Sequence, residues 1–328
     1  MSEGGVQREG SGSESGVAIE RSMGRRRSDR IVGAGRATQE IVDQAMALAR
    51  SDRPVLIIGA PGSGKDHLAR AIHAWSSRAA QPFVAVSCAA LPEALLAREI
   101  FGCAEGAHPQ LPEEHVGALT RAAGGTLLVD AIESAPEGVR ERLARALVDG
   151  RFQRDGDSAG LALRARVIAT CGAAPARSPF GDVAPHVLQL PPLSARREDV
   201  LPLAAHFLRL FSDEAGVTPI GFTPEARSAL LSEPWPGNVR ELAERVRQAI
   251  RLAGSGAISA EALLLAAEGE DIPSFKEAKR AFETRYVVGL LRRCGGNISR
   301  AARLARKDRK DFYDVIRRTG IDPARFRS

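Results

Sequence analysis

The fold is decided by the stretch Val55-Leu56-Ile57-Ile58-Gly59-Ala60-Pro61-Gly62-Ser63-Gly64-Lys65-Asp66. Its four apolar residues predict a buried strand, and the chain from about Gly64 to Ser76 has the pattern of a helix. Glycines between a strand and a helix let backbone amides wrap an anion, and a lysine at the helix start reaches the terminal phosphates. We therefore predict a nucleotide site whose phosphate-binding residues are Gly59, Gly62, Ser63, Gly64, Lys65 and Asp66.

A later strand supplies a second acidic element. Gly125-Thr126-Leu127-Leu128-Val129-Asp130 is an apolar run that ends in a carboxylate. A carboxylate in this place holds Mg²⁺ beside a bound nucleotide, so Asp130 is the predicted metal-side residue, with Asp66 as a second candidate. Nucleotide hydrolases place a glutamate next to it to orient water, whereas this chain has Ala131, whose methyl group cannot polarise water. The sequence predicts binding of ATP or ADP with Mg²⁺, and weak or absent hydrolysis.

The remaining apolar runs place this loop in a larger sheet. Further strands are predicted at 83–86, 126–129, 165–169 and 187–190. Helical patterns separate them, at 91–100 and 136–149 among others. Strands that alternate with helices indicate a parallel sheet covered on both faces. The next segment carries helical patterns throughout, with predicted starts near Arg197, Thr223, Asn238 and Ser259.

Basic charge is concentrated at the carboxyl-terminal end. The chain carries a net charge of +6, and residues 275–328 hold 16 Lys and Arg against six Asp and Glu. Such an excess is typical of a surface that binds a polyanion. A solvated basic surface stays the alternative at this point.

Composition also bears on the compartment. No run of 18 apolar residues occurs, the amino-terminal residues have no apolar signal core, and the four cysteines have no metal-ligand spacing. The sequence thus predicts a cytoplasmic protein without a membrane span, a zinc site or a disulfide framework.

Several blocks, taken in order, resemble the AAA+ domain of sigma-54-dependent activators, also called bacterial enhancer-binding proteins. Besides Gly59–Asp66 and Gly125–Asp130, these are Phe101-Gly102, Leu190-Pro191-Pro192-Leu193 and Trp235-Pro236-Gly237-Asn238-Val239-Arg240-Glu241-Leu242. The resemblance runs from about Ile31 to Gly320. It implies an α/β fold, an AAA+ P-loop parallel sheet with a helical lid. It also implies that Arg240, at the position of the family's sensor II arginine, contacts nucleotide from the lid.

The carboxyl-terminal segment resembles the Fis-type helix-turn-helix that these proteins carry. Gly296-Asn297-Ile298-Ser299-Arg300-Ala301-Ala302 matches the start of its first helix, and residues 308–318 are the predicted reading helix, with Asp308 as its N-cap. Arg and Lys suit guanine edges and phosphates. The resemblance and the charge predict binding of double-stranded DNA by Arg300, Arg309, Lys310, Tyr313 and Arg317, while Phe312, Val315 and Ile316 pack inward. Arg306 replaces the glycine usual in the turn.

The predicted domains follow from these patterns. They are a disordered tail (1–30), the AAA+ α/β nucleotide-binding subdomain (31–195), the helical lid (196–268), a linker (269–274) and an all-α helix-turn-helix DNA-binding domain (275–328). Within 275–290, apolar residues recur at three- and four-residue steps, which predicts a long amphipathic helix.

Departures from the family concern turnover and the contact with sigma-54. The family's GAFTGA loop reads Gly106-Ala107-His108-Pro109-Gln110-Leu111, and the glutamate and its asparagine partner are Ala131 and Ser87. Cys171 replaces the sensor I asparagine, and residues 180–188 lack the arginine fingers. Glu133, two residues after the missing glutamate, is not expected to substitute for it. His108 and His115 are interpreted as exposed loop histidines.

Three functions remain open from the sequence. The preferred one is a DNA-binding regulator that binds ATP or ADP without fast turnover and without sigma-54 remodelling. The second is a working sigma-54 activator with divergent catalytic residues, and the third is a protein-interaction scaffold that binds no DNA. The family implies a homo-oligomer, a dimer or a hexamer, with RNA polymerase or a sigma factor as a further partner.

Overall fold

The computed structural model describes residues 19–22, 30–107, 113–175, 177–217, 219–266, 284, 286–305 and 307–326. The chain forms two compact units, Met1–Leu263 and Leu264–Ser328. Within the described residues, no helix is long and apolar enough to cross a membrane, and no group of three potential metal ligands occurs. The four cysteines are buried and form no disulfide.

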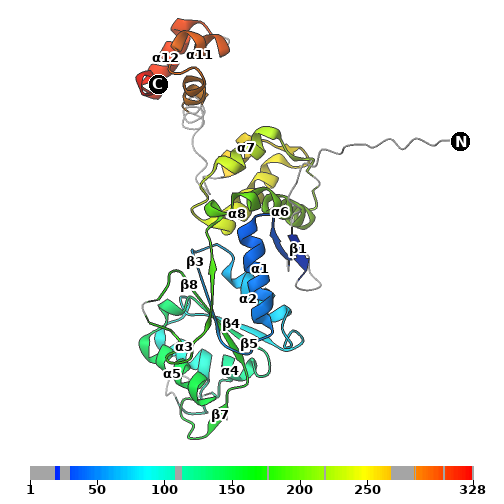
Figure 1. The fold of residues 1–328 in the computed structure, drawn as a ribbon, viewed down its shortest axis with the longest axis vertical. Helices are drawn as coiled ribbons and strands as arrows, with labels where there is room; N and C mark the ends of the chain where they lie inside the picture. The colour runs from blue at the N-terminus through cyan, green and yellow to red at the C-terminus, as the bar shows by residue number, and fades with distance from the viewer. Residues whose placement is uncertain are drawn as a thin grey trace, which may run out of the picture. The chain divides into compact units, whose positions relative to one another are not determined.

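The larger unit is built on a five-stranded sheet (Figure 1). Its strands are β3 (Val55–Gly59), β4 (Phe83–Ser87), β5 (Thr126–Asp130), β8 (Arg166–Cys171) and β9 (His186–Leu190), in the order β4-β5-β8-β3-β9. Every pair is parallel. The five strands predicted from apolar runs are confirmed, and their carboxyl ends, including Gly59 and Asp130, lie along one edge of the sheet.

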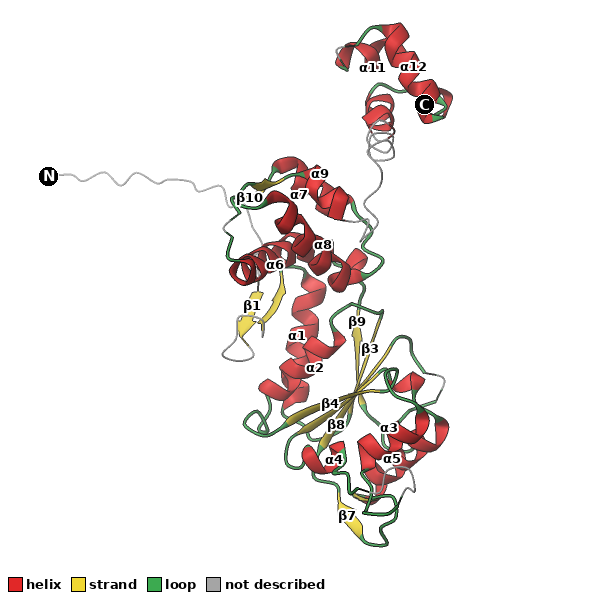
Figure 2. Cartoon of the chain, turned by 180° about the vertical axis from the view of Figure 1, so that it is seen from behind, coloured by secondary structure: helices red, strands yellow, loops and turns green. Residues whose placement is uncertain are grey.

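Helices cover both faces of the sheet (Figure 2). On one face, α1 (Arg36–Ala49) and α2 (Lys65–Ala74) share a core with β3, β8 and β9. On the other face, α3 (Glu93–Phe101), α4 (Ala118–Arg121) and α5 (Glu137–Asp149) share a second core with the sheet. Burial on both faces explains why β5 and β8 are almost continuously apolar.

The lid follows the last strand of the sheet. Two 3-10 turns, Leu193–Ala195 and Arg197–Asp199, lead into its helices. These are α6 (Val200–Ala215), α7 (Pro224–Ser232), α8 (Asn238–Ala253) and α9 (Ala260–Leu265). The predicted starts are confirmed to within three residues. The Thr223 hydroxyl accepts a hydrogen bond from the Ala226 amide at 3.2 Å and so caps α7.

Three short pairs of strands correct the sequence predictions. β1 (Ile19–Ser22) pairs antiparallel with β2 (Arg30–Gly33), although residues 1–30 were predicted as disordered. The lid is not purely helical, because β10 (Gly221–Phe222) pairs with β11 (Ala257–Ile258). β6 (Arg151–Gln153) and β7 (Gly160–Ala162) form an unpredicted hairpin. These segments are too short to give a periodic signal, and backbone pairing stabilises them.

The base of the loop that includes residues 106–111 is fixed by backbone pairing. Cys103 bridges to His115 and to Asp155, and the His115 Nε2 atom lies within hydrogen-bond distance of the Glu99 carboxylate, at 3.0 Å. His115 is thus partly buried and paired, which corrects its interpretation as an exposed loop histidine. Gly106 and Ala107 belong to the described chain, whereas residues 108–112, with His108, lie outside it.

The smaller unit consists of short helices. Residues 286–293 are helical and are followed by α11 (Ile298–Leu304), α12 (Arg309–Thr319) and a 3-10 turn at Pro323–Phe326. Its core brings together residues from all three helices: Val287, Leu291, Cys294, Ala301, Ala302, Phe312, Val315 and Ile316. The predicted helix start at residues 275–283 and the turn residue Arg306 lie outside the described chain.

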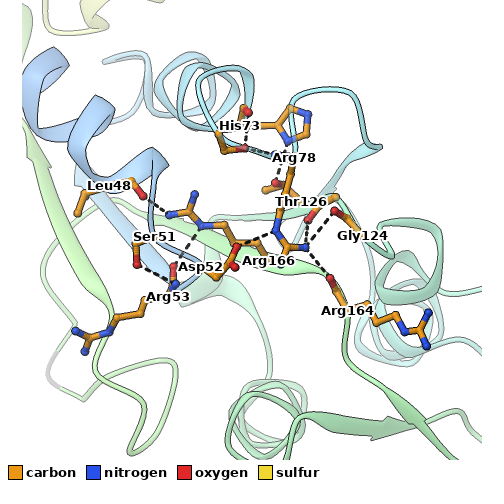
Figure 3. A network of polar contacts seen from close by, with 12 residues as sticks. Leu48, Ser51, Asp52, Arg53, His73, Arg78, Gly124, Thr126, Arg164 and Arg166 are labelled. Carbon is orange, nitrogen blue, oxygen red and sulfur yellow. Dashed lines mark hydrogen bonds and ion pairs between the residues drawn. The ribbon is translucent and has the colours of Figure 1, made fainter.

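A polar network closes the opposite edge of the sheet, where the strands begin (Figure 3). The Arg166 side chain, 2% exposed, donates to the Leu48 carbonyl at 2.7 Å and to the Arg53 carbonyl at 3.3 Å. Arg78 donates to Asp52 at 2.9 Å and to the Arg164 carbonyl at 2.8 Å. Burial lowers the pKa of Arg166. These guanidinium groups connect the end of α1 to the sheet.

The Arg166→Met variant is expected to lower the free energy of unfolding by about 2–4 kcal/mol, because it loses a buried guanidinium together with its hydrogen bonds to the Leu48 and Arg53 carbonyls. Urea denaturation measures this loss. The matched control is Arg164→Met, which removes the neighbouring exposed guanidinium. Equal midpoints for the two variants would contradict a structural role of the buried group.

Candidate nucleotide-binding site

The phosphate loop lies between β3 and α2 and needs glycine at three positions. Gly62 and Gly64 have φ values of 73° and 106°, in the left-handed region that L residues avoid. A Cβ on Gly59 would lie 2.8 Å from the Leu190 carbonyl oxygen. The backbone therefore has the curved path that directs loop amides at an anion.

The charged residues of the loop have defined partners. The Lys65 ammonium donates to the carbonyls of Gly59 and Ala60, at 2.7 and 3.2 Å. The Lys65 nitrogen thus lies against the loop that is predicted to bind the phosphates. Asp66 instead pairs with Arg70 at 3.0 Å on the exposed face of α2. The carboxylate predicted as a second metal-side candidate is directed at an arginine.

A cavity of about 250 Å³ adjoins the phosphate loop. Its walls are mostly apolar and come from β2, α1, α2 and α6, with Gly64 and His67 beside the loop. The apolar residues include Ile31, Val32, Ile41, Leu203 and Phe207. An apolar cavity beside an anion-binding loop suits a heterocyclic base linked to phosphates. In the sequence, nothing distinguishes these residues from ordinary core positions, so they are not among the predicted site residues.

Asp130 ends β5 on the same edge of the sheet as the loop. The Thr170 hydroxyl donates to its carboxylate at 2.5 Å, and the Ala131 amide donates to the Thr170 hydroxyl at 3.0 Å. Ala131 has a φ of 54°, uncommon for a residue with a Cβ. The structure thus supports Asp130 on a rigid strand end, with a methyl group at the next position.

Glu133 reaches the neighbouring strand end. Its carboxylate accepts a hydrogen bond from the Gly172 amide at 2.7 Å. Burial, with Asp130 and Glu133, raises the pKa of Cys88 to about 12. Burial and Glu133 also raise the pKa of Cys171, against the effect of Lys65. Both thiols are therefore protonated at neutral pH.

The lid reaches the loop through the start of α8. The Arg240 amide donates to the Gly62 carbonyl at 3.2 Å, so the predicted lid arginine does lie beside the loop. Asn238, which is not among the predicted site residues, donates to the Pro61 carbonyl at 3.0 Å. Arg196 donates to the Ser63 carbonyl at 2.6 Å. Only the specific Trp235–Leu242 block could have pointed to Asn238.

The basic residues of the smaller unit lie on its surface. Arg300, Arg309, Lys310, Tyr313 and Arg317 are all exposed. Phe312, Val315 and Ile316 are buried, which confirms the predicted inward face of α12. The Asp308 carboxylate accepts from the Lys310 amide at 2.8 Å, which confirms the N-cap. The exposed face of α12 therefore carries its cations, interspersed with Asp311 and Asp314, while the opposite face forms the core.

Comparisons with known proteins match the part of the chain that forms the sheet and the part that forms the lid. The sigma-54 interaction domain family matches residues 31–178, and the AAA+ ATPase lid domain family matches residues 194–278. The transcriptional regulatory protein GlrR of Escherichia coli (strain K12) is 35% identical over 298 residues, covering 88% of this chain and 67% of GlrR. The alginate biosynthesis transcriptional regulatory protein AlgB of Pseudomonas aeruginosa is 37% identical over 234 residues, covering 69% of this chain and 52% of AlgB.

Solved structures agree with this assignment. The crystal structure of NtrX from Brucella abortus in complex with ADP aligns with a TM-score of 0.64 and 29% identity, covering 89% of this chain and 69% of NtrX. The same protein in complex with ATP aligns with a TM-score of 0.63. From its phosphate loop, parallel sheet and helical lid, and from these relatives, the chain belongs to the family of sigma-54-dependent transcriptional regulators.

Proposed function

We propose that this chain is a DNA-binding transcription regulator that binds ATP or ADP with Mg²⁺ but does not hydrolyse ATP efficiently and does not remodel sigma-54. The observation that carries the proposal is that nucleotide-binding features and the end of β5 lie at the same edge of the sheet. An intact phosphate loop and a base-sized cavity lie beside a strand end that reads Asp130-Ala131. The chain keeps the groups that bind a nucleotide and lacks groups that cleave it.

Nucleotide binding is assigned to the loop, Asp130 and the lid. The curved backbone at Gly62 and Gly64 and the ammonium of Lys65 suit the phosphates. Arg240 lies next to the loop, and Asp130 offers the oxygen ligand that Mg²⁺ prefers. The NtrX complexes with ADP and ATP support the same ligand class for this chain.

Self-association as a hexamer or a dimer, and a cytoplasmic location, are proposed because both are typical of the family.

Weak hydrolysis is expected from the residues at the carboxyl ends of β4, β5 and β8. Ser87, the last residue of β4, pairs in register with Asp130, and Ala131 follows directly after that pair. Cys171 is a protonated thiol at the end of β8. Residues 180–188 contain no arginine, and an arginine finger contributes about 10³–10⁵ in rate. Each loss removes a group that acts only in the transition state.

DNA binding is assigned to α12 and the start of α11. The exposed cations of α12 and its buried opposite face fit a reading helix in the major groove. The altered loop sequence at 106–111 supports regulation without sigma-54 remodelling. The chain would then act on RNA polymerase or another sigma factor, or it would assemble with active relatives and interfere with them.

A working sigma-54 activator is the second candidate function. The match of residues 31–178 to the sigma-54 interaction domain favours it. Open-complex formation by purified protein on a sigma-54 promoter would establish it. Absence of any binding to sigma-54, at concentrations where DNA is bound, would remove it.

Nucleotide affinity and steady-state hydrolysis of the parent chain and of Ala131→Glu test the proposal. We expect saturable binding of ADP and ATP by both proteins. The parent should turn over well below about 1 s⁻¹, near the low end of enzymatic rates. An increase of about 10²-fold or more in Ala131→Glu would identify the missing carboxylate as one block. Parent turnover at or above about 1 s⁻¹, or no nucleotide binding, would contradict the proposal.

A further inference from the structure

The carbonyl groups of the phosphate loop are all engaged. Lys65 holds the carbonyls of Gly59 and Ala60. The next three carbonyls each accept one donor from beyond the sheet. These pairs are Asn238 Nδ2 to Pro61 at 3.0 Å, the Arg240 amide to Gly62 at 3.2 Å, and Arg196 Nη2 to Ser63 at 2.6 Å. Three consecutive loop residues are thus tied to the lid and to the turn that leads into it.

These ties determine where the loop amides point. In a trans peptide the carbonyl of one residue and the amide of the next point in opposite directions. Donors that hold the carbonyls of Pro61 and Ser63 on the lid side therefore turn the amides of Gly62 and Gly64 to the other side. Loop amides directed away from such ties are the groups that bind phosphate.

Asn238 has a geometry suited only to an asparagine. Its side chain Oδ1 accepts from the Leu193 amide at 2.8 Å, and Nδ2 donates to the carbonyls of Pro61 and Pro236, at 3.0 and 3.3 Å. The residue is 2% exposed and has a φ of 58°, which asparagine tolerates better than most residues. One buried amide thus joins the phosphate loop, the turn before the lid and the chain that leads into α8.

Arg196 joins the same loop to the amino-terminal part of the unit. Its side chain, 6% exposed, lies 3.7 Å from the fully buried Asp199 carboxylate. Asp199 in turn accepts hydrogen bonds from the amides of Ala34 and Gly35, at 2.7 and 2.8 Å, and from the Thr38 hydroxyl. Burial lowers the pKa of Arg196, and Asp199 opposes this effect. The arginine and Thr38 both line the 250 Å³ cavity.

We propose that Asn238 and Arg196 are positioning residues that hold the phosphate loop in its anion-binding conformation, so that nucleotide affinity depends on docking of the lid. The inference rests on the proposed nucleotide binding. Docking of the lid and the conformation of the loop are then coupled. Because coupling is reciprocal, docking of the lid raises the affinity for nucleotide by the same factor by which bound nucleotide favours the docked lid.

Asn238→Asp is the sharpest test, since it keeps the shape and the acceptor but replaces the donor with a carboxylate oxygen that faces two carbonyls. Asn238→Gly, which suits the positive φ, is the second variant in case the first does not fold. The matched control is Thr223→Ala, which removes the cap of α7 within the lid without touching the loop. Thermal unfolding of every variant shows that the unit is folded.

Hydrogen exchange of the nucleotide-free chain is the first measurement. The amides of Ser63 and Arg240 are bonded to the carbonyls of Ala60 and Gly62. In either Asn238 variant we expect both amides to exchange at least about tenfold faster than in the parent, and Thr223→Ala to leave them unchanged. Parent-like exchange in both Asn238 variants, or an equal increase in Thr223→Ala, would overturn the inference.

Affinity for mant-ADP, a fluorescent ADP, is the second measurement. We expect both Asn238 variants to bind at least about tenfold more weakly than the parent, and Thr223→Ala to bind as the parent does. Unchanged affinity in the Asn238 variants would overturn the inference. If the parent itself bound no ADP, the proposed function would fail, while the exchange measurement would still decide whether the lid holds the loop.

Discussion

The Gly62→Ala variant is expected to bind ADP at least about 100-fold more weakly than the parent chain, a loss of about 2.7 kcal/mol. The added Cβ would lie 2.3 Å from the Gly237 carbonyl oxygen and 3.1 Å from the Arg240 Cβ. Backbone atoms cannot rotate away, so the lid has to separate from the loop. The φ of 73° adds strain at the same residue. Titration with mant-ADP and denaturant unfolding measure the two consequences.

Gly216→Ala provides the matched control for backbone strain. Gly216 ends α6 with a φ of 66°, and a Cβ there would have no neighbour within 4 Å. This variant should lose about 1–2 kcal/mol of unfolding free energy and keep its affinity for ADP. If the two variants bound ADP equally well, contact between Gly62 and the lid would have no part in nucleotide binding.

The second large effect is expected in DNA binding. The double variant Arg309→Ala, Lys310→Ala should bind duplex DNA at least about 100-fold more weakly at low salt. It should also reduce the slope of log affinity against log salt concentration by about 2, because each lost phosphate contact changes the slope by about 1. Both side chains lie at the exposed start of α12. Mobility-shift titrations at several salt concentrations measure both quantities.

The control removes the same charge from another helix. Arg292 and Arg293 are exposed on the helical segment 286–293, and Arg292→Ala, Arg293→Ala lowers the net charge equally. If α12 is the reading helix, this control should lose clearly less affinity for DNA than the Arg309→Ala, Lys310→Ala variant. Equal losses would indicate a general basic surface, and no binding by the parent at low salt would favour the scaffold function.

The sequence predicted the parts of the fold that local patterns encode. Continuous apolar runs located β3 and β5, because a strand buried on both faces has to be apolar at every position. Glycines followed by Lys65 located the phosphate loop, since positive φ values restrict the residue type. The helical spacing of apolar residues along α12 predicted that Phe312 is buried and that Lys310 is exposed. The short strands β1 and β10 were missed, as two to four residues carry no period.

Residue types and spacing by themselves therefore determined the phosphate loop and the sheet, and they led to the proposal that Ala131 stands where nucleotide hydrolases carry a carboxylate. Only the tertiary structure decided that Asn238 and Arg196 hold the loop, that Asp199 anchors Arg196, and that Glu133 is bonded to Gly172. Asn238 donates to a residue 177 positions away. Hydrogen bonds across such separations depend on how the lid folds back onto the sheet, and a periodicity within one element carries no information about that.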